Sequence, residues 1–391
     1  MSDRNGAGVI VVGGGVTGLS AAWWLARRGA DVLLLEKGIV GWEASGRNGG
    51  GCTHPQSPLF LEEQRLWPQM DELLGYPTEW RPYRIRVALA EADFERFAPW
   101  IEMIRHNGLR AERLDPKQVL ELCPLASDAN LGGWFHDGGH ANPQRTAQAY
   151  AWALQDLGGR ILQHTMVTGF TTRGGRVTAV ETSRGSFACD ELVIAAGPQT
   201  GVLTALLGQE IPVTPARAEM IVTEPLPLLR HGGIDGNGLY GRQTLRGNLA
   251  YGGGLHEWLD PPAEDMRLPP RSSTPVLASL ARRLVALFPK AAHARVIRSW
   301  AGFIENTPDG RPVIDRLGIY DNVVAATMSS VGFGLSPASG RAIAELVLDR
   351  TCSFADLSTL RLARFGNLGE RWREERGWVP PAPASLAGPV A

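Results

Sequence analysis

A glycine-rich pattern near the start of the chain has the spacing that backbone binding of phosphate requires. Gly13, Gly15 and Gly18 form GxGxxG, and Glu36 ends the apolar run that follows. In such a pattern the first glycine permits a tight turn, the second lets a pyrophosphate approach the backbone, and the third lets a helix pack closely on a strand. The phosphate would lie at the N-terminus of that helix, and Glu36 would bind ribose hydroxyls. The alternative is a glycine-rich turn with a purely structural role.

The elements that would hold this pattern follow from the periodicity of apolar residues. Residues 9–12 and 32–35 are continuous apolar runs, which are typical of parallel strands buried on both faces. Between them, Leu19, Ala22 and Trp23 recur at helical spacing. Strand, turn, helix and strand in this order predict a dinucleotide-binding α/β fold.

Two further glycine-rich segments lie far apart in the chain, SGRNGGG at residues 45–51 and SVGFGLSPASG at residues 330–340. In the second segment, Ser336 and Pro337 have the types preferred at the N-cap and at the first helical position. We therefore expect a helix from about Ala338 whose positive end faces the preceding glycines, where it would stabilise negative charge on a ligand. The alternatives are a solvated surface loop for the first segment and an ordinary strand-to-helix turn for the second.

The middle of the chain contains several strand-like runs and one helical run. Alternating or continuous apolar residues predict strands at residues 161–167, 177–181, 187–190, 192–197, 239–244 and 249–254. Residues 274–287 have the periodicity of an amphipathic helix. Ala196 and Gly197 are small residues at a strand end, which would allow close approach of a ligand.

Bulk properties narrow the classes of function. A chain of 391 residues exceeds the usual size of one core, so we expect two domains. A formal net charge of -1 argues against nucleic acid or an anionic membrane as a partner and favours a small molecule. The four cysteines have neither disulfide-framework nor zinc-site spacing, so we expect no metal. The polar start and the short apolar runs argue against a signal peptide or a transmembrane segment, and we expect a cytoplasmic protein.

Three blocks of sequence, taken in order, resemble the FAD-dependent amine and amino-acid oxidoreductases, the family of D-amino-acid oxidase, glycine oxidase and sarcosine oxidase. The blocks are VGGGVTGLSAAWWLARRGADVLLLEKG, LVIAAGPQT, and WAGFIENTPDGRPVID followed by SSVGFGLSPASG. The resemblance covers nearly the whole chain. It implies a Rossmann-type, glutathione-reductase-like FAD-binding domain and a second domain with a mixed or antiparallel sheet for the substrate. The FAD-binding domain would comprise residues 1–80, 143–215 and 300–391, and the substrate-binding domain residues 81–142 and 216–299.

The same resemblance implies which residues contact FAD. The loop at 45–51 would lie beside the isoalloxazine ring, where backbone without side chains can approach. Val167 would contact the adenine, and Ala196 with Gly197 would lie against the pyrophosphate. Gly302 stands where monomeric sarcosine oxidases have the cysteine that binds flavin, so FAD would be non-covalent. The expected FAD contacts are Gly13, Gly15, Val16, Thr17, Gly18, Glu36, Lys37, Ser45, Arg47, Asn48, Gly49, Gly50, Val167, Ala196, Gly197, Gly302, Gly332, Phe333, Gly334, Leu335 and Ser336.

The resemblance also places a carboxylate-binding site over the flavin. Tyr240 matches the tyrosine of this site in glycine oxidase-like members. Ile304 stands in place of their arginine, and Gly334 in place of the lysine of sarcosine oxidases. Another cation must then bind the carboxylate. Arg242, two residues from Tyr240 and so on the same strand face, is the first candidate, and Arg47 is the second.

His54 and His256 each follow a glycine-rich loop and are further candidate site residues. The alternative for each histidine, and for Arg242, is an ordinary surface or packing role. Family members transfer the α hydrogen as hydride to flavin N5, which requires positioning more than an acid or a base. We therefore expect FAD-dependent oxidation of the C–N bond of an opine, a D-amino acid, glycine or an imino acid, giving an imine that water hydrolyses.

The combination of RNGGG, GRQT and WAGFIENTPDG most resembles the catalytic subunits of heteromeric opine, glycine and proline dehydrogenases. This implies partner subunits that accept electrons. Two alternatives stay open. One is a stand-alone oxidase of glycine, sarcosine or D-amino acids that uses oxygen. The other is a flavin-bearing electron-transfer or structural subunit without a substrate site of its own, which the missing arginine motivates.

Overall fold

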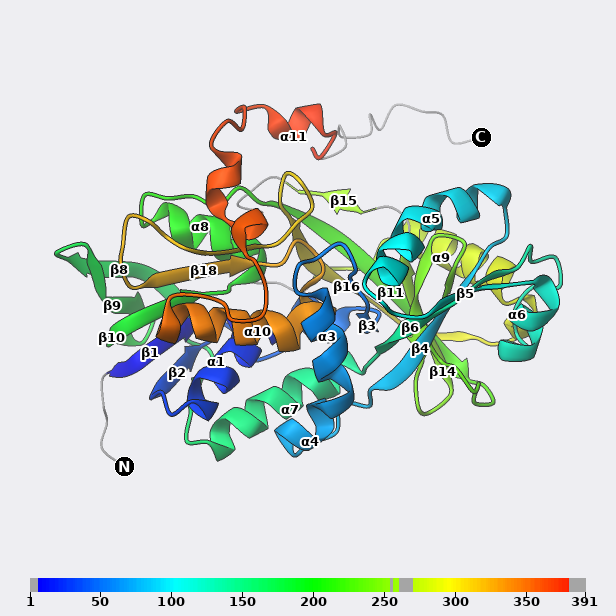
Figure 1. Cartoon of the computed structure of the whole chain (residues 1–391), viewed down its shortest axis with the longest axis horizontal. Helices are drawn as coiled ribbons and strands as arrows, with labels where there is room; N and C mark the ends of the chain where they lie inside the picture. The colour runs from blue at the N-terminus through cyan, green and yellow to red at the C-terminus, as the bar shows by residue number, and fades with distance from the viewer. Residues whose placement is uncertain (1–5, 254–255, 260–269, 380–391) are drawn as a thin grey trace.

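Two β-sheets lie side by side in the computed structural model, which describes residues 6–253, 256–259 and 270–379 (Figure 1). Within these residues the first sheet has eight strands. They are β1 (Gly6–Val12), β2 (Val32–Leu35), β7 (Arg160–Leu162), β8 (Val167–Arg173), β9 (Arg176–Thr182), β10 (Gly185–Ile194), β17 (Val313–Arg316) and β18 (Val323–Thr327). The strand order is β17-β18-β10-β1-β2-β7, and β9 with β8 extends from β10.

The centre of the first sheet is parallel because its strands are covered on both faces. β18, β10, β1, β2 and β7 run in one direction, whereas β17 pairs antiparallel with β18, and β8 and β9 form an antiparallel meander with β10. In β1, Val9 and Val11 belong to one apolar core, and Ile10 and Val12 belong to another on the opposite face. Such strands must be apolar at every position, which explains the continuous runs. The expected α/β class is confirmed.

Three helices cover one face of this sheet: α1 (Val16–Arg27), α7 (Pro143–Asp156) and α10 (Gly332–Asp349) (Figure 1). Two short helices, α3 (Phe60–Leu66) and α4 (Met70–Leu74), pack against the same core. The other face is covered by the β8–β9 meander and by α8 (Thr200–Ala205). The result is a layered arrangement in which α1 and α10 both begin beside the carboxyl ends of the parallel strands.

The second sheet has ten strands within the described ranges. They are β3 (Gly51–Cys52), β4 (Arg81–Val87), β5 (Ala111–Leu114), β6 (Gly133–His140), β11 (Thr214–Pro225), β12 (Ile234–Gly236), β13 (Leu239–Gln243), β14 (Asn248–Gly253), β15 (Glu257–Trp258) and β16 (Val296–Asn306). Their order is β15-β11-β14-β13-β12-β4-β6-β3, with β16 on β11 and β5 on β6. The pairs are antiparallel except for β12 with β4, so this sheet is mixed.

Alternation along β4 gives the second sheet one apolar and one polar face. Ile85 and Val87 belong to an apolar core that also contains residues of α6 (Pro116–Leu122) and α9 (Thr274–Leu287). Arg84 and Arg86 therefore point to the opposite face, because successive side chains of a strand alternate. α5 (Glu91–His106) lies on that polar side, since the guanidinium of Arg86 lies over the ring of Trp100 in this helix. The polar face is the one that meets the first sheet's loops.

Several predicted elements are confirmed and others differ. β2 and α9 have the predicted bounds. The strand expected at residues 161–167 is interrupted, because His164 has a φ of 53° and Thr165 N–H donates to Glu36 O, so β7 ends at Leu162 and β8 begins at Val167. The runs at 187–190 and 192–197 belong to one strand, β10, which ends at Ile194. Residue 254, at the end of the expected 249–254 strand, lies outside the described residues. Among those residues, no helix has the length and hydrophobicity to cross a membrane.

Candidate cofactor and substrate sites

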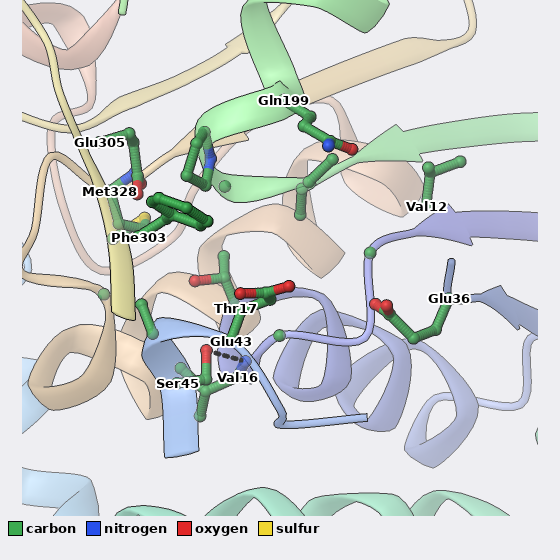
Figure 2. Close-up of a pocket in the computed structure, with 18 of the residues that line it drawn as sticks. Val12, Val16, Thr17, Glu36, Glu43, Ser45, Gln199, Phe303, Glu305 and Met328 are labelled. Carbon is green, nitrogen blue, oxygen red and sulfur yellow. Dashed lines mark hydrogen bonds between the residues drawn. The ribbon is translucent and has the colours of Figure 1, made fainter. Parts of the chain in front are cut away.

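A cavity of about 1150 Å³ lies at the carboxyl ends of β1, β2 and β10 (Figure 2). Crevices at the carboxyl ends of parallel strands are the usual binding place in open α/β sheets. Of the residues expected to contact FAD, those that line this cavity are Gly13, Gly15, Val16, Thr17, Glu36, Lys37, Ser45, Asn48, Val167, Ala196, Gly197, Gly332 and Phe333.

The first glycine loop has the geometry that its spacing predicts. Gly13 has a φ of 111°, and a Cβ there would lie 2.3 Å from Ala195 O. A Cβ on Gly18 would lie 2.0 Å from Gly13 O, so this glycine lets α1 begin directly against the loop, although it does not line the cavity. Ser45 Oγ accepts a hydrogen bond from Val16 N–H at 2.9 Å, the bond drawn in Figure 2. The second glycine loop is thereby tied to the N-terminus of α1.

Glu36 has a structural role in addition to the expected one. Its carboxylate accepts hydrogen bonds from the N–H groups of Gly14 and Gly38, each at 2.7 Å. Burial raises the pKa of Glu36, and these two N–H groups act in the opposite direction. The carboxylate therefore fixes the glycine loop and still lines the cavity (Figure 2), where its remaining lone pairs can accept ribose hydroxyls.

Two cavity-lining carboxyl groups were missed by the sequence analysis. Glu43 precedes α2 (Ala44–Arg47), and its buried Oε2 has no hydrogen-bond partner among the described residues. Glu305, in β16, accepts hydrogen bonds from Met328 N–H at 3.0 Å and from Thr327 Oγ at 3.1 Å, and burial raises its pKa. Both are labelled in Figure 2. No periodicity in the sequence marks either glutamate as a site residue, although Glu305 lies within the WAGFIENTPDG block and Glu43 lies two residues before the loop at 45–51.

Arg47 and Gly302 do not line the cavity, in contrast to their expected role. The Arg47 guanidinium donates to Trp42 O at 2.7 Å and to Ala301 O at 2.6 Å, so it attaches α2 to β16. Burial lowers the pKa of Arg47. A Cβ on Gly302 would make an ordinary van der Waals contact with the Arg47 stem, at 3.4 Å, so the packing here does not require glycine. Asn48 does line the cavity, but its side chain bonds Ala44, Ser45 and Gly50 of its own loop.

α10 begins earlier than expected. Its first residue is Gly332, with Val331 at the N-cap, and Pro337 lies inside the helix. Trp67 and Trp24 donate to the carbonyls of Gly334 and Pro337. These side-chain donors stabilise the turns around the proline, which cannot supply its own N–H. Gly332 and Phe333 therefore form the first helical turn, whose free N–H groups face the cavity.

Leu335 and Ser336 are fully buried and line neither cavity. Their expected contact with FAD is not supported, because both lie in the helix interior, and Ser336 is not an N-cap.

A second cavity of about 720 Å³ shares Asn48, Ser330 and Phe333 with the first. Its wall includes the glycine residues 49–51 and Gly334. It also contains the side chains of His54, Arg84, Arg86, Asp235 and Tyr240. The polar face of the second sheet thus meets the cofactor cavity through a common wall.

Arg84, Arg86 and Asp235 form the charged part of this wall. Arg84 Nη2 forms a close ion pair with Asp235 Oδ1, whereas Arg86 Nη1 lies 3.7 Å from Asp235 Oδ2. The Arg86 guanidinium lies 3.9 Å from the centre of the Trp100 ring, and its Nε has no hydrogen-bond partner among the described residues. Burial lowers the pKa of Arg86 to about 10 and Asp235 raises it, so Arg86 is charged at neutral pH. The feature of the sequence that could have indicated these two arginines is the alternation of arginine with apolar residues in RIRV, residues 84–87.

Arg242 lies on the same face of β13 as Tyr240, as expected, but it lies behind the glycine loop. Its side chain is buried, and Nη1 donates to Gly49 O at 3.1 Å. Burial lowers its pKa to about 10. Gly49 and Gly50 cover the guanidinium, so Arg242 does not line either cavity. Tyr240 does line the second cavity, and its side chain is 39% exposed.

The two candidate histidines lie in different parts of the structure. His54 lines the second cavity, whereas His256 does not. The His256 ring packs near Trp258 of β15, a strand at the end of the sheet order remote from β4 and β12. Burial lowers the pKa of His256. Its expected place in the substrate site is therefore not supported.

Comparisons with known proteins identify the family. A family model described as "FAD dependent oxidoreductase" (DAO) matches residues 8–346. The sarcosine oxidase subunit beta of Rhodobacter capsulatus is 28% identical over 355 residues, which cover 87% of this chain and 84% of the relative. The glycine oxidase of Geobacillus kaustophilus is 29% identical over 393 residues, 92% and 98% of the two chains. Its crystal structure superposes with a TM-score of 0.83 at 26% identity, covering 92% of this chain and 98% of that one. The L-proline dehydrogenase structure from P. horikoshii, at 23% identity and a TM-score of 0.81, covers 96% and 100% and shares the fold.

The residues of the first cavity fit FAD. A Cβ on Gly15 would extend to within 3.1 Å of Ser45 Oγ, in the narrow space at the N-terminus of α1 where a pyrophosphate would bind. Glu43 Oε2 is a buried oxygen that needs a donor, and the hydroxyls of FAD are donors. The Rossmann-type fold and the resemblance inferred from sequence are confirmed. This chain belongs to the FAD-dependent oxidoreductase family.

Proposed function

We propose that this chain oxidises the C–N bond of an amino acid or secondary amine that carries a carboxylate. When bound, FAD supplies the acceptor for the hydride that leaves the carbon next to nitrogen, and the resulting imine is hydrolysed by water. One observation carries the proposal. A cavity with two arginines and one aspartate has a net positive charge, and it shares a wall with the cofactor cavity.

The carboxylate would bind Arg86. Arg84 is already paired with Asp235, whereas Arg86 has an ion pair but no hydrogen bond within the described residues. A guanidinium stacked on an aromatic ring keeps its edge N–H groups available for a planar carboxylate. Tyr240, which lines the same cavity, would orient the substrate.

In this proposal the two sheets bind different molecules. The first sheet and its helices would hold FAD without a covalent bond, because Gly302 offers no side chain for attachment. The polar face of the second sheet would hold the substrate. The domain ranges given from the sequence, and a cytoplasmic location, stay predictions.

The names of relatives bear on the choice of substrate and partner. Relatives are named sarcosine oxidase subunit beta, glycine oxidase and hydrogen cyanide synthase subunit HcnC. Two of these names describe subunits, which supports partner chains that accept electrons. A stand-alone oxidase that uses oxygen is the second candidate. A subunit without a substrate site is disfavoured by the charged second cavity.

Anaerobic mixing of the FAD-loaded protein with a panel of ligands tests this function. The panel contains opines, D-amino acids, glycine, sarcosine and cyclic imino acids, each beside an amine of the same shape without the carboxylate. We expect at least one member of the panel to bleach the flavin and its matched amine to fail. A flavin that stays yellow with every member would refute the proposal. Full activity of the purified single chain with oxygen would refute the need for partner subunits.

A further inference from the structure

A histidine that lines the second cavity, His54, is paired with a buried glutamate, Glu63. Glu63, in α3, has no exposed surface, and its two oxygens accept hydrogen bonds from His54 N–H at 3.0 Å and from His54 Nδ1 at 2.8 Å. A carboxylate at Nδ1 fixes the proton on that nitrogen and leaves the lone pair on Nε2. His54 is thus held in the tautomer that can accept a proton on its other side.

The ring of His54 lies against the start of α10, beside the cofactor cavity. A Cβ on Gly334 would lie 2.2 Å from Cε1 and 2.6 Å from Nδ1 of this ring, so a side chain at position 334 and the imidazole cannot occupy the same place. Nε2 has no hydrogen-bond partner in the part of the chain that the structure describes. His54 side-chain atoms are 17% exposed, and the residue lines the second cavity. A proton on Nε2 can therefore come from a ligand in that cavity.

The charges around His54 determine what it can do. Glu63 faces it from α3, Arg84 and Arg86 belong to the same cavity on β4, and Asp235 belongs to it on β12. Tyr240 on β13 and the backbone of α10 complete the wall. The two arginines favour an anionic group of the ligand on their side. The buried Glu63 stabilises positive charge that develops on His54.

We propose that His54, held by Glu63, takes the proton from the ammonium group of the substrate. The inference rests on the proposed function. An amine can release a hydride from its neighbouring carbon only when its nitrogen has a lone pair, and an alkylammonium has a pKa of about 10. In the step, one N–H bond of the ammonium breaks and an Nε2–H bond forms, with no change of oxidation state. The proton leaves to solvent after the product departs.

The pH dependence of flavin reduction tests this role. At pH 7 only about one amine in a thousand is neutral in water, so we expect His54→Gln to slow anaerobic reduction by roughly 10²- to 10⁴-fold. The loss should shrink by about tenfold per pH unit as pH approaches the pKa of the free amine, because the neutral amine then needs no base. Glu63→Gln should slow flavin reduction by a smaller factor, with the same dependence on pH. His106→Gln, at an exposed position of α5, is the matched control.

If the ratio of the flavin reduction rates of wild type and His54→Gln stays constant from pH 6 to pH 10, the inference is overturned. The effect of a purely structural role would not depend on whether the amine is protonated. FAD content and thermal unfolding of each variant separate loss of folding from loss of the base. If no panel member reduces the wild-type flavin, the proposed function fails. If the wild type is reduced and the ratio is constant, only the role of His54 fails.

A second readout needs no turnover. α-Aminoisobutyrate has no α hydrogen and cannot be oxidised, and trimethylacetate has the same shape without the nitrogen. In protein labelled with ¹⁵N-histidine, assigned by comparison with His54→Gln, we expect α-aminoisobutyrate to shift the Nε2 signal of His54 because its ammonium group hydrogen-bonds to Nε2, and trimethylacetate not to do so. Binding of each is followed by the flavin absorbance. An Nε2 signal that is the same with both bound ligands would overturn the inference.

Discussion

Replacing Arg86 with glutamine tests the assignment of the substrate carboxylate. In the folded chain the Arg86 guanidinium lies 3.9 Å from the centre of the Trp100 ring and 3.7 Å from Asp235 Oδ2. Asp235 already has Arg84 as its close partner. Loss of Arg86 therefore leaves no buried carboxylate without a cation, and the fold should tolerate the change.

The expected loss of affinity follows from the charge of Arg86. Its pKa is lowered to about 10 by burial, so the group keeps its charge at pH 7. Removing a partly buried cation that binds a carboxylate costs about 2 to 4 kcal/mol, which is roughly a 30- to 900-fold rise in Kd. Arg86→Lys keeps the charge but loses the fork of parallel N–H groups, and we expect a loss of roughly tenfold.

The assay is the anaerobic titration of flavin absorbance with a carboxylate ligand, followed by the concentration dependence of flavin reduction. Arg295→Gln, at a side chain that is 89% exposed, is the matched surface control. We expect Arg86→Gln to weaken carboxylate ligands and to leave the weak binding of the matched amines unchanged. Equal affinities in wild type and Arg86→Gln would refute the reasoning.

Three further outcomes are expected. Gly18→Ala should reduce FAD retention on gel filtration, because its Cβ would lie 2.0 Å from Gly13 O, while Gly318→Ala, whose Cβ meets nothing within 4 Å, is the matched control. Gly334→Ala should displace the imidazole of His54, because the new Cβ would lie 2.2 Å from its Cε1 atom. This variant should therefore reproduce the pH-dependent loss of flavin reduction expected for His54→Gln. Glu305 has a pKa raised by burial, so its contribution to stability is lost as pH rises through that pKa. Thermal unfolding should therefore show that the stability of Glu305→Gln rises relative to the wild type as pH increases above 4.5, the ordinary pKa of glutamate, and a difference independent of pH would contradict this.

Local patterns were sufficient to predict the first strand–helix–strand unit of the cofactor half of the molecule. The β1–α1–β2 unit could be predicted because each part is specified by neighbouring residues: continuous apolar runs for strands covered on both faces, and glycines where a Cβ would collide. The start of α10 could not be predicted from Ser336 and Pro337. The side chains that stabilise the helix around the proline, Trp24 and Trp67, come from distant parts of the chain.

The choice of the substrate cation could not be predicted for a related reason. Arg86 alternates with apolar residues in β4, and Arg242 shares a strand face with Tyr240 in β13, so both were reasonable candidates for the polar face of the same sheet. Only the position of the glycine loop separates them, because Gly49 and Gly50 cover Arg242 and leave Arg86 at the cavity. Sequence alternation gives the face of a strand, but a loop folded from elsewhere decides which residues on that face a ligand can reach.

The loop at residues 45–51 forms the wall that the two cavities share, because Asn48 lines both of them. Hydrogen bonds hold this loop from three sides: Ser45 accepts from the N-terminus of α1, the Asn48 side chain bonds the loop's own backbone, and Arg242 of the second sheet donates to Gly49 O. A Cβ on Gly49 would lie 2.9 Å from Tyr240 Cδ2, and a Cβ on Gly50 would collide with Ala141 O and lie 3.1 Å from Arg242 Nη1. Glycine at these two positions therefore lets the backbone pass between the first cavity and the polar face of the second sheet.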